Sequence, residues 1–128
     1  MFGWRGSGHF LMTLSAPGLL TKPGSAIYAT TKHAALGFAE SLVVAHGAPG
    51  IGVTALCPQA VDTPLLATIP NGAAQRDGVL TPAEVAEAGL RGVEEGVFLA
   101  TPHARVRDYV RRKAEDHDRR IAAKRHYT

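Results

Sequence analysis

A tyrosine, a lysine and a serine are spaced as a proton-transfer site would need them. Tyr28 and Lys32 stand four positions apart in YATTK, and Ser15 precedes the tyrosine by thirteen positions. If this stretch is helical, Tyr28 and Lys32 lie on the same face one turn apart. A free phenol is almost fully protonated at neutral pH, whereas a fixed ammonium nearby favours its ionised form. The pattern therefore indicates proton transfer at a carbonyl or alcohol oxygen, with Ser15 as a second hydroxyl that holds this oxygen.

Each of these residues also has an ordinary structural explanation. A tyrosine and a lysine stand four apart by chance in many helices, and a serine at the end of a strand is commonly a turn former. The histidines are far apart and form no HExxH motif, so no metal site is expected and surface placement explains them. They are His9, His33, His46, His103, His117 and His126.

Three short apolar runs, residues 9–15, 51–57 and 97–101, are expected to form buried strands. Ser15 ends the first run and Pro58 follows the second. The carboxyl ends of parallel strands meet at one edge of a sheet, where ligands bind in open α/β folds. We therefore expect Ser15 and the Pro58 segment to lie at the same edge.

Helical patterns alternate with these runs. The proline-free stretch from Ser25 to His46 predicts a long helix, the capping box TPAE at residues 81–84 begins a helix that runs to Glu95, and residues 104–125 predict one charged, basic C-terminal helix. The alternation predicts an α/β fold: a partial doubly wound, Rossmann-like parallel sheet of about three strands with helices on both faces, in a single domain of residues 1–128.

The stretch of residues 59–80 is too long for an ordinary connection and is typical of a functional lid or substrate loop. It contains the apolar residues Leu65, Leu66 and Ile69. These side chains either line a pocket for an apolar carbonyl or alcohol, or pack the inner face of the lid on the body of the protein. The sequence leaves both alternatives open.

Together, these motifs resemble those of the short-chain dehydrogenase/reductase family. Tyr28 and Lys32 match its Tyr-x-x-x-Lys motif, Thr31 matches the small hydroxyl residue before the lysine, and Ser15 matches its serine thirteen residues before the tyrosine. The segment PQAVDT that begins at Pro58 is similar to the family's Pro-Gly-x-Val-x-Thr. TPAEVA resembles its late helix, so the resemblance covers nearly the whole chain.

The resemblance implies an oxidoreductase that uses NAD or NADP to transfer hydride between an alcohol and a carbonyl. Tyr28 would be the acid and base, Lys32 would favour the ionised tyrosine and bond the nicotinamide ribose, and Ser15 would orient the substrate. The segment from Pro58 to Thr63, with Gln59 and Val61, would lie against the nicotinamide and its carboxamide. Gln59 replaces the glycine that is usual in the family, which puts a side chain where the backbone runs close to the cofactor.

The glycine-rich turn that binds the cofactor pyrophosphate in this family has no counterpart here. The glycines of GWRGSG, residues 3–8, precede a strand rather than a helix, so we interpret them as a loop. The chain thus resembles the carboxyl-terminal half of such an enzyme, either as a fragment or as a truncated gene product. We expect it to bind NAD or NADP weakly or not at all, and to be inactive by itself.

The same resemblance suggests a second function. The first strand would lack its usual neighbour, and its exposed edge could pair with another chain. The helix from Ser25 to His46 often packs against a partner subunit in the family and could support a homodimer. A non-catalytic interaction or dimerisation module derived from the family is therefore the alternative to an enzyme.

Composition narrows the other possible partners. Residues 105–128 carry nine basic and four acidic side chains, which we interpret as a solvated helix face rather than a nucleic-acid site. The apolar stretch from Phe10 to Leu20 is interrupted and too short to cross a membrane. Cys57 is the single cysteine, so no internal disulfide can form and a cytoplasmic location is expected. The substrate and the choice between NAD and NADP are not encoded in these motifs.

Overall fold

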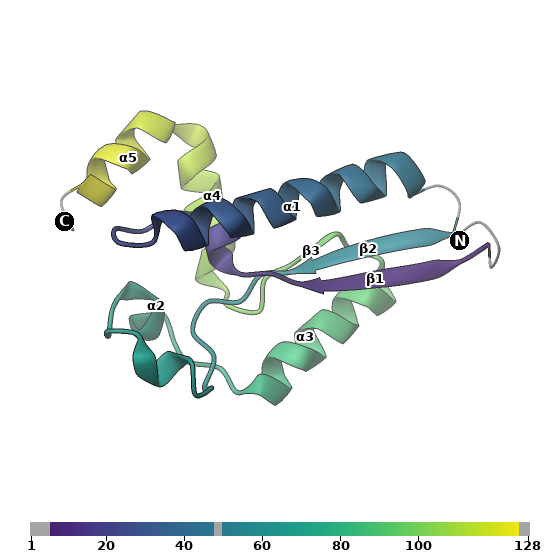
Figure 1. Ribbon diagram of the computed structural model, residues 1–128, viewed down its shortest axis with the longest axis horizontal. Coiled ribbons are helices and arrows are strands. Elements are labelled where there is room, and N and C mark those ends of the chain that lie inside the picture. Colours follow the sequence, from purple (N-terminus) through teal and green to yellow (C-terminus); the bar gives the residue numbers. More distant parts are fainter. Residues whose placement is uncertain (1–5, 48–49, 126–128) are drawn as a thin grey trace.

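The computed structural model describes residues 6–47 and 50–125, with a parallel three-stranded sheet at the centre (Figure 1). The strands are β1 (Gly8–Thr13), β2 (Ile51–Leu56) and β3 (Leu99–Ala100), in the order β1-β2-β3. The expected α/β fold with a partial Rossmann-like sheet is confirmed. The predictions for Gly3 and His126 concern residues outside the described ranges.

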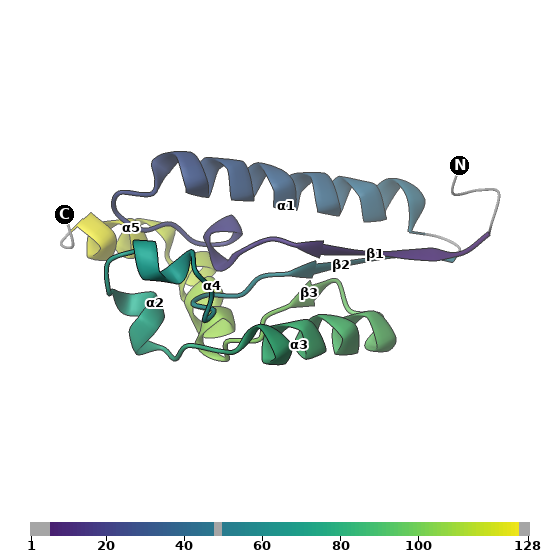
Figure 2. The ribbon, with the colours of Figure 1, turned by 60° about the horizontal axis from the view of Figure 1, so that its bottom comes forward.

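Helices cover both faces of this sheet, with α1 on one face and α3 on the other (Figure 2). All strands run in the same direction, and their carboxyl ends point toward α2 and α4 (Figure 1). The helical elements are α1 (Ala26–His46), α2 (Ala73–Arg76), α3 (Pro82–Glu95), α4 (Arg105–Glu115), α5 (His117–Arg125), and the 3-10 turns η2 (Ala16–Gly18) and η3 (Leu66–Thr68).

The core has one part on each side of the sheet. Leu14, Leu36, Ala55 and Cys57 are buried together under α1. Leu56, Val85 and Ala100 are buried together under α3. Burial of each large aliphatic side chain contributes about 1.5–3 kcal/mol, so these clusters fix the positions of both helices on the sheet.

Glycines let α3 approach the sheet closely. A Cβ atom added at Gly92 would lie 3.0 Å from Cγ2 of Thr54 and 3.3 Å from Cβ of Ala100, and one added at Gly89 would lie 3.0 Å from Cδ2 of Leu56. Both glycines are buried. Larger residues at these positions would separate α3 from β2 and β3.

The predicted N-cap, Thr81, does begin α3. Thr81 is the N-cap and its Oγ1 accepts a hydrogen bond of 3.1 Å from the Glu84 amide. Such a cap stabilises a helix by about 1 kcal/mol. The helix ends at Gly96, whose left-handed backbone (φ 69°) is the usual conformation for a glycine at this position.

The prediction of one continuous C-terminal helix over residues 104–125 is wrong. Asp116 is extended (φ −152°, ψ 91°) and separates α4 from α5. Its Oδ1 accepts a 2.9 Å hydrogen bond from the Arg119 amide, so the aspartate caps α5 instead of continuing α4. The Arg120 guanidinium lies 5.3 Å from the centroid of the Tyr109 ring and joins the two helices.

Two strands are shorter than expected. β1 ends at Thr13, so Ser15 lies in the turn that precedes η2 instead of in the strand. β3 contains only Leu99 and Ala100 of the predicted residues 97–101. β1 pairs with β2 along its whole length and is an edge strand of the described sheet.

Candidate active site

Ser15 and the Pro58 segment lie side by side at the carboxyl edge of the sheet. Ser15 is buried, and its Oγ donates a long hydrogen bond of 3.5 Å to the Pro58 carbonyl oxygen. The Ala16 amide donates a stronger bond of 2.8 Å to the same oxygen. The turn after β1 is therefore joined directly to the turn after β2, as expected for neighbouring parallel strands.

Tyr28 and Lys32 lie on the first turns of α1. Lys32 Nζ is 5.5 Å from the centroid of the Tyr28 ring, within the range of a cation–π interaction. Tyr28 is 44% exposed and borders an open hollow of about 670 Å³. The residues that line this hollow are Gly24, Ser25, Ala26, Ile27, Tyr28 and Thr31.

A close backbone approach connects this part of α1 to the Ser15 turn. A Cβ atom added at Gly18, the last residue of η2, would lie 3.0 Å from the Lys32 carbonyl oxygen. The Gly18 amide in turn donates a 2.9 Å hydrogen bond to the Ser15 carbonyl. The 3-10 turn thus sets the separation between the Ser15 backbone and the Lys32 turn of the helix.

The side chain of Gln59, the residue that departs from the family pattern, contacts Asp77 near the other end of the stretch of residues 59–80. Its Nε2 donates a 3.4 Å hydrogen bond to Oδ2 of Asp77. Its Oε1 is buried, and among the described residues no donor contacts it. The structure therefore leaves a buried amide oxygen next to Pro58 that can accept a hydrogen bond.

The stretch of residues 59–80 closes on itself. Val61 and Leu80 form a parallel bridge, and the Leu80 amide donates a 3.1 Å bond to the Ala60 carbonyl. The Thr63 carbonyl accepts a 3.0 Å bond from the Leu66 amide at the start of η3. The side chain of Leu65 is 63% exposed and that of Ile69 is 37% exposed, so the described protein does not cover the outer part of this loop.

Comparison with known proteins gives the family. The model of the short chain dehydrogenase family matches residues 1–74, more than half of the chain, and this span includes all the site residues predicted from the sequence. The chain belongs to the short-chain dehydrogenase family. The turn after β1, the first turns of α1 and the turn after β2 therefore come from the part of the chain that matches the family.

Curated relatives in the family agree with this assignment. The chain is 42% identical over 67 residues to 1-deoxy-11-beta-hydroxypentalenate dehydrogenase of Streptomyces exfoliatus, covering 51% of this chain and 24% of that protein. It is 35% identical over 85 residues to oxidoreductase UcpA of Escherichia coli, covering 66% of this chain and 32% of that protein. The chain thus matches about a quarter to a third of the length of these relatives.

Solved structures of short-chain dehydrogenases share the fold. A Burkholderia cenocepacia enzyme in complex with NADP superposes with a TM-score of 0.78 at 20% identity, over 93% of this chain and 48% of that one. A Burkholderia phymatum enzyme in complex with NAD superposes with a TM-score of 0.71 at 26% identity, over 91% of this chain and 50% of that one. The chain therefore spans about half the length of these short-chain dehydrogenases.

The structure adds a histidine that the sequence motifs did not select for the site. His103 was expected at the surface but is only 4% exposed, so that prediction is wrong. Its Nδ1 accepts a 2.9 Å hydrogen bond from the Gln59 amide, and its Nε2 lies 2.9 Å from the Ala60 carbonyl oxygen. Its position soon after a short strand was the available signal, because such positions lie at the carboxyl edge of the sheet.

Asp77 and Tyr109 were also missed. The Tyr109 hydroxyl donates a 2.7 Å hydrogen bond to Oδ2 of Asp77, the same oxygen that accepts from Gln59. Burial raises the pKa of Tyr109, and the hydrogen bond to Asp77 raises it further. These contacts attach the second half of the residue 59–80 loop to α4, and no local sequence motif signals them.

Cys57, which follows β2 directly, is fully buried and has no role in the predicted chemistry. Burial raises the pKa of its thiol from 9.0 to about 11, and a hydrogen bond from the Ser15 backbone opposes this change. The thiol is therefore protonated at neutral pH. It acts as a small apolar core residue beside Leu14 and Leu36.

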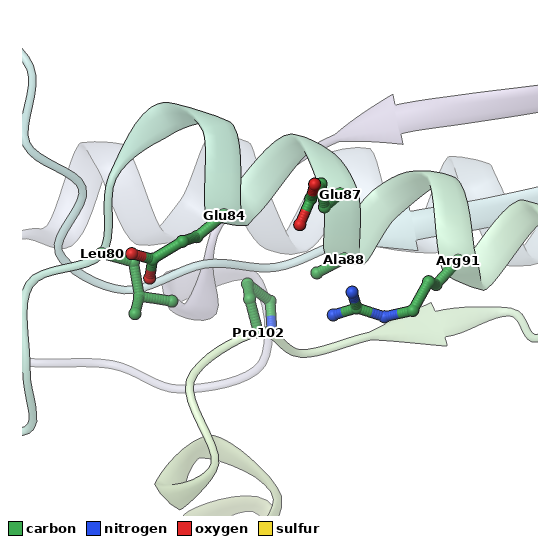
Figure 3. Close-up of a pocket in the computed structure, with 6 residues that line it drawn as sticks. All are labelled: Leu80, Glu84, Glu87, Ala88, Arg91 and Pro102. Carbon is green, nitrogen blue, oxygen red and sulfur yellow. The ribbon is translucent and has the colours of Figure 1, made fainter.

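A second hollow of about 210 Å³ lies between α3 and the turn after β3 (Figure 3). It contains none of the predicted site residues and is lined by Leu80, Glu84, Glu87, Ala88, Arg91 and Pro102. Within residues 6–47 and 50–125, no group of three or more potential ligands is placed to hold a metal ion. No helix in the same ranges is both long and apolar enough to span a membrane.

Proposed function

We propose that Ser15, Tyr28 and Lys32 form the proton-transfer part of an oxidoreductase that interconverts a carbonyl and an alcohol with NAD or NADP. The contact that carries this proposal is the Lys32 ammonium 5.5 Å from the Tyr28 ring, beside an open hollow. Tyr28 lines this hollow, where its hydroxyl can exchange a proton with the oxygen of a carbonyl or an alcohol. Family membership supports the assignment of these residues.

The residues have separable roles in this proposal. In the reductive direction, the Tyr28 hydroxyl gives its proton to the substrate carbonyl oxygen, which becomes the alcohol oxygen. The Ser15 hydroxyl donates a hydrogen bond to that same oxygen and orients it. Because its present bond to Pro58 is 3.5 Å long, and therefore weak, Ser15 can turn toward a substrate at small energetic cost.

The residues after β2 fit the amide part of a nicotinamide cofactor. A carboxamide carries an NH₂ group that needs an acceptor, and Gln59 Oε1 is a buried acceptor without a partner among the described residues. Gln59 and its neighbours Pro58, Val61 and Thr63 would hold the carboxamide, and Lys32 would bond the ribose. When bound, the cofactor supplies or accepts the hydride at the substrate carbon.

We further propose that these 128 residues bind the cofactor weakly and turn over no substrate when tested alone. The sheet has three described strands, and β1 has a neighbour on only one side. The related solved enzymes that hold NADP or NAD are about twice as long. Much of the binding surface for a dinucleotide would therefore come from structure beyond the residues described.

Titration of the purified chain with NADPH and with NADH tests the proposed site and the proposed weak binding. Calorimetry should give an affinity weaker than micromolar, and a micromolar affinity would refute weak binding. Amide NMR shifts at millimolar cofactor should concentrate at Gln59, Ala60 and Lys32. Lys32→Met should reduce these shifts, whereas Glu87→Gln, in the other hollow, should leave them unchanged. Shifts confined to the hollow beside α3 would refute the proposed site.

A second candidate function is a non-catalytic interaction or dimerisation module. It is favoured by the edge strand β1 and by the exposed apolar side chains of Ile27 (83%), Phe38 (62%) and Val44 (85%) on α1. Ile27 and Phe38 are eleven positions apart and so lie on the same side of the helix, and exposed apolar side chains of this kind are common in protein interfaces. Light scattering after size-exclusion chromatography should then show a dimer that Phe38→Glu dissociates, and a stable monomer would count against this function.

A further inference from the structure

His103 bridges two neighbouring peptide groups of the segment after β2. Nδ1 accepts from the Gln59 amide at 2.9 Å, so this nitrogen carries no proton. The proton of the neutral ring is therefore on Nε2, which donates to the Ala60 carbonyl oxygen at 2.9 Å. Because both bonds are made by a side chain that is only 4% exposed, water does not compete for them freely.

The peptide that joins Pro58 to Gln59 is held from both ends. Its carbonyl oxygen accepts from the Ala16 amide at 2.8 Å and from Ser15 Oγ at 3.5 Å. Its N–H group donates to His103. The C=O and N–H of a trans peptide point in opposite directions within one plane, so rotation of this plane would break both sets of bonds. His103 and the Ser15 turn thus fix one peptide plane together.

We propose that His103 is a positioning residue, which fixes the backbone of Gln59 and Ala60 in the orientation that the cofactor carboxamide requires. This inference rests on the proposed function. His103 contacts neither substrate nor cofactor in this scheme and acts only through the peptide groups that it holds. The Ala60 oxygen also accepts a 3.1 Å bond from the Leu80 amide, so the same histidine stabilises the closure of the residue 59–80 loop.

Substitutions can separate the two hydrogen bonds of the ring. In His103→Asn the amide oxygen lies near the position of Nδ1 and can still accept from Gln59. In His103→Gln the amide nitrogen lies near the position of Nε2 and can still donate to Ala60. His103→Leu retains neither bond. The asparagine and glutamine variants provide a matched pair if the leucine variant does not fold.

The first measurements need no ligand. The imidazole ¹⁵N shifts of His103 should show an unprotonated Nδ1 and a protonated Nε2. Hydrogen exchange at the Gln59 amide should be roughly tenfold faster in His103→Gln than in His103→Asn, because only the asparagine keeps an acceptor. The Val53 amide in β2 serves as the control and should exchange equally in both. A protonated Nδ1, or equal exchange at Gln59 in both variants, would overturn the bridging geometry.

The second measurement connects the bridge to cofactor binding. NADPH-induced shifts at Ala60 should be retained in His103→Asn and be lost or relocated in His103→Gln. If both variants respond to NADPH as the wild-type chain does while exchange at Gln59 differs, the positioning role is refuted. If the wild-type chain itself shows no shifts with NADPH, the proposed function fails, and the exchange data still decide whether His103 holds this peptide.

Discussion

Replacement of Gly18 by alanine tests how closely the Ser15 turn must approach α1. The new Cβ atom would lie 3.0 Å from the Lys32 carbonyl oxygen, 3.4 Å from the carbonyl carbon and 3.7 Å from Lys32 Cβ. The nearest of these contacts involves backbone, which cannot rotate away as the end of a flexible side chain can. Either η2 or the Lys32 turn of α1 must therefore move by a few tenths of an ångström.

Two opposing effects determine the size of the change in stability. Overpacking of this kind costs about 1–3 kcal/mol. Alanine also reduces the conformational freedom of the unfolded chain, which stabilises the folded state by about 0.4–1 kcal/mol. This gain applies here because Gly18 has no positive φ and alanine can adopt its backbone conformation. We expect Gly18→Ala to lower the free energy of unfolding by about 1–2 kcal/mol.

A second glycine provides the control. A Cβ atom added at Gly37, on the exposed side of α1, would meet no atom within 4 Å. Gly37→Ala should therefore stabilise the chain by about 0.5–1 kcal/mol through helix propensity. Urea unfolding followed by circular dichroism measures both variants. If Gly18→Ala is as stable as Gly37→Ala, the close contact between η2 and the Lys32 turn does not exist in solution.

Three further substitutions test Cys57, Asp77 and Tyr109. The Cys57 thiol loses its proton at a lower pH in the unfolded chain than in the folded chain. The thiol therefore stabilises the folded chain below about pH 9, and this contribution of at most about 3 kcal/mol should be lost as the pH rises toward 11. Cys57→Ala should remove this part of the pH dependence in urea titrations. If the free energy of unfolding changes between pH 8 and 11 by the same amount in the variant as in the wild-type chain, this prediction is wrong. Asp77→Ala should lower the pKa of Tyr109 in an NMR titration and reduce stability by about 1–3 kcal/mol. Tyr109→Phe should cost less, because it leaves the Gln59 contact in place.

Elements with a local signal could be predicted from the sequence. Thr81 and Glu84 define the start of α3 through their own hydrogen bond, and the long stretch without proline predicts α1. The break at Asp116 has the same local origin, because an aspartate that caps a following helix competes with continuation of the preceding one. The prediction failed there because the charged pattern of α4 and α5 is continuous on both sides of the break.

Contacts between distant segments could not be read in the same way. Asp77 meets Gln59 and Tyr109, and His103 meets the backbone of residues 59 and 60, across separations of eighteen to forty-four positions. Such pairs are set by how the turns after β2 and β3 meet at the edge of the sheet. The chain periodicity that identifies helices and strands contains no information about these side chains.

The glutamine that departs from the family's usual glycine is accommodated by these distant contacts. Among the described residues only glycines have positive φ, so the backbone at Gln59 has a conformation that any L-residue can adopt. Its amide donates to His103 and its side-chain nitrogen to Asp77. A glycine at this position would keep the first bond and lose the second, so Gln59 joins the turn after β2 to the loop that ends at Leu80. The glutamine therefore replaces backbone freedom in the turn after β2 with a side-chain contact to Asp77.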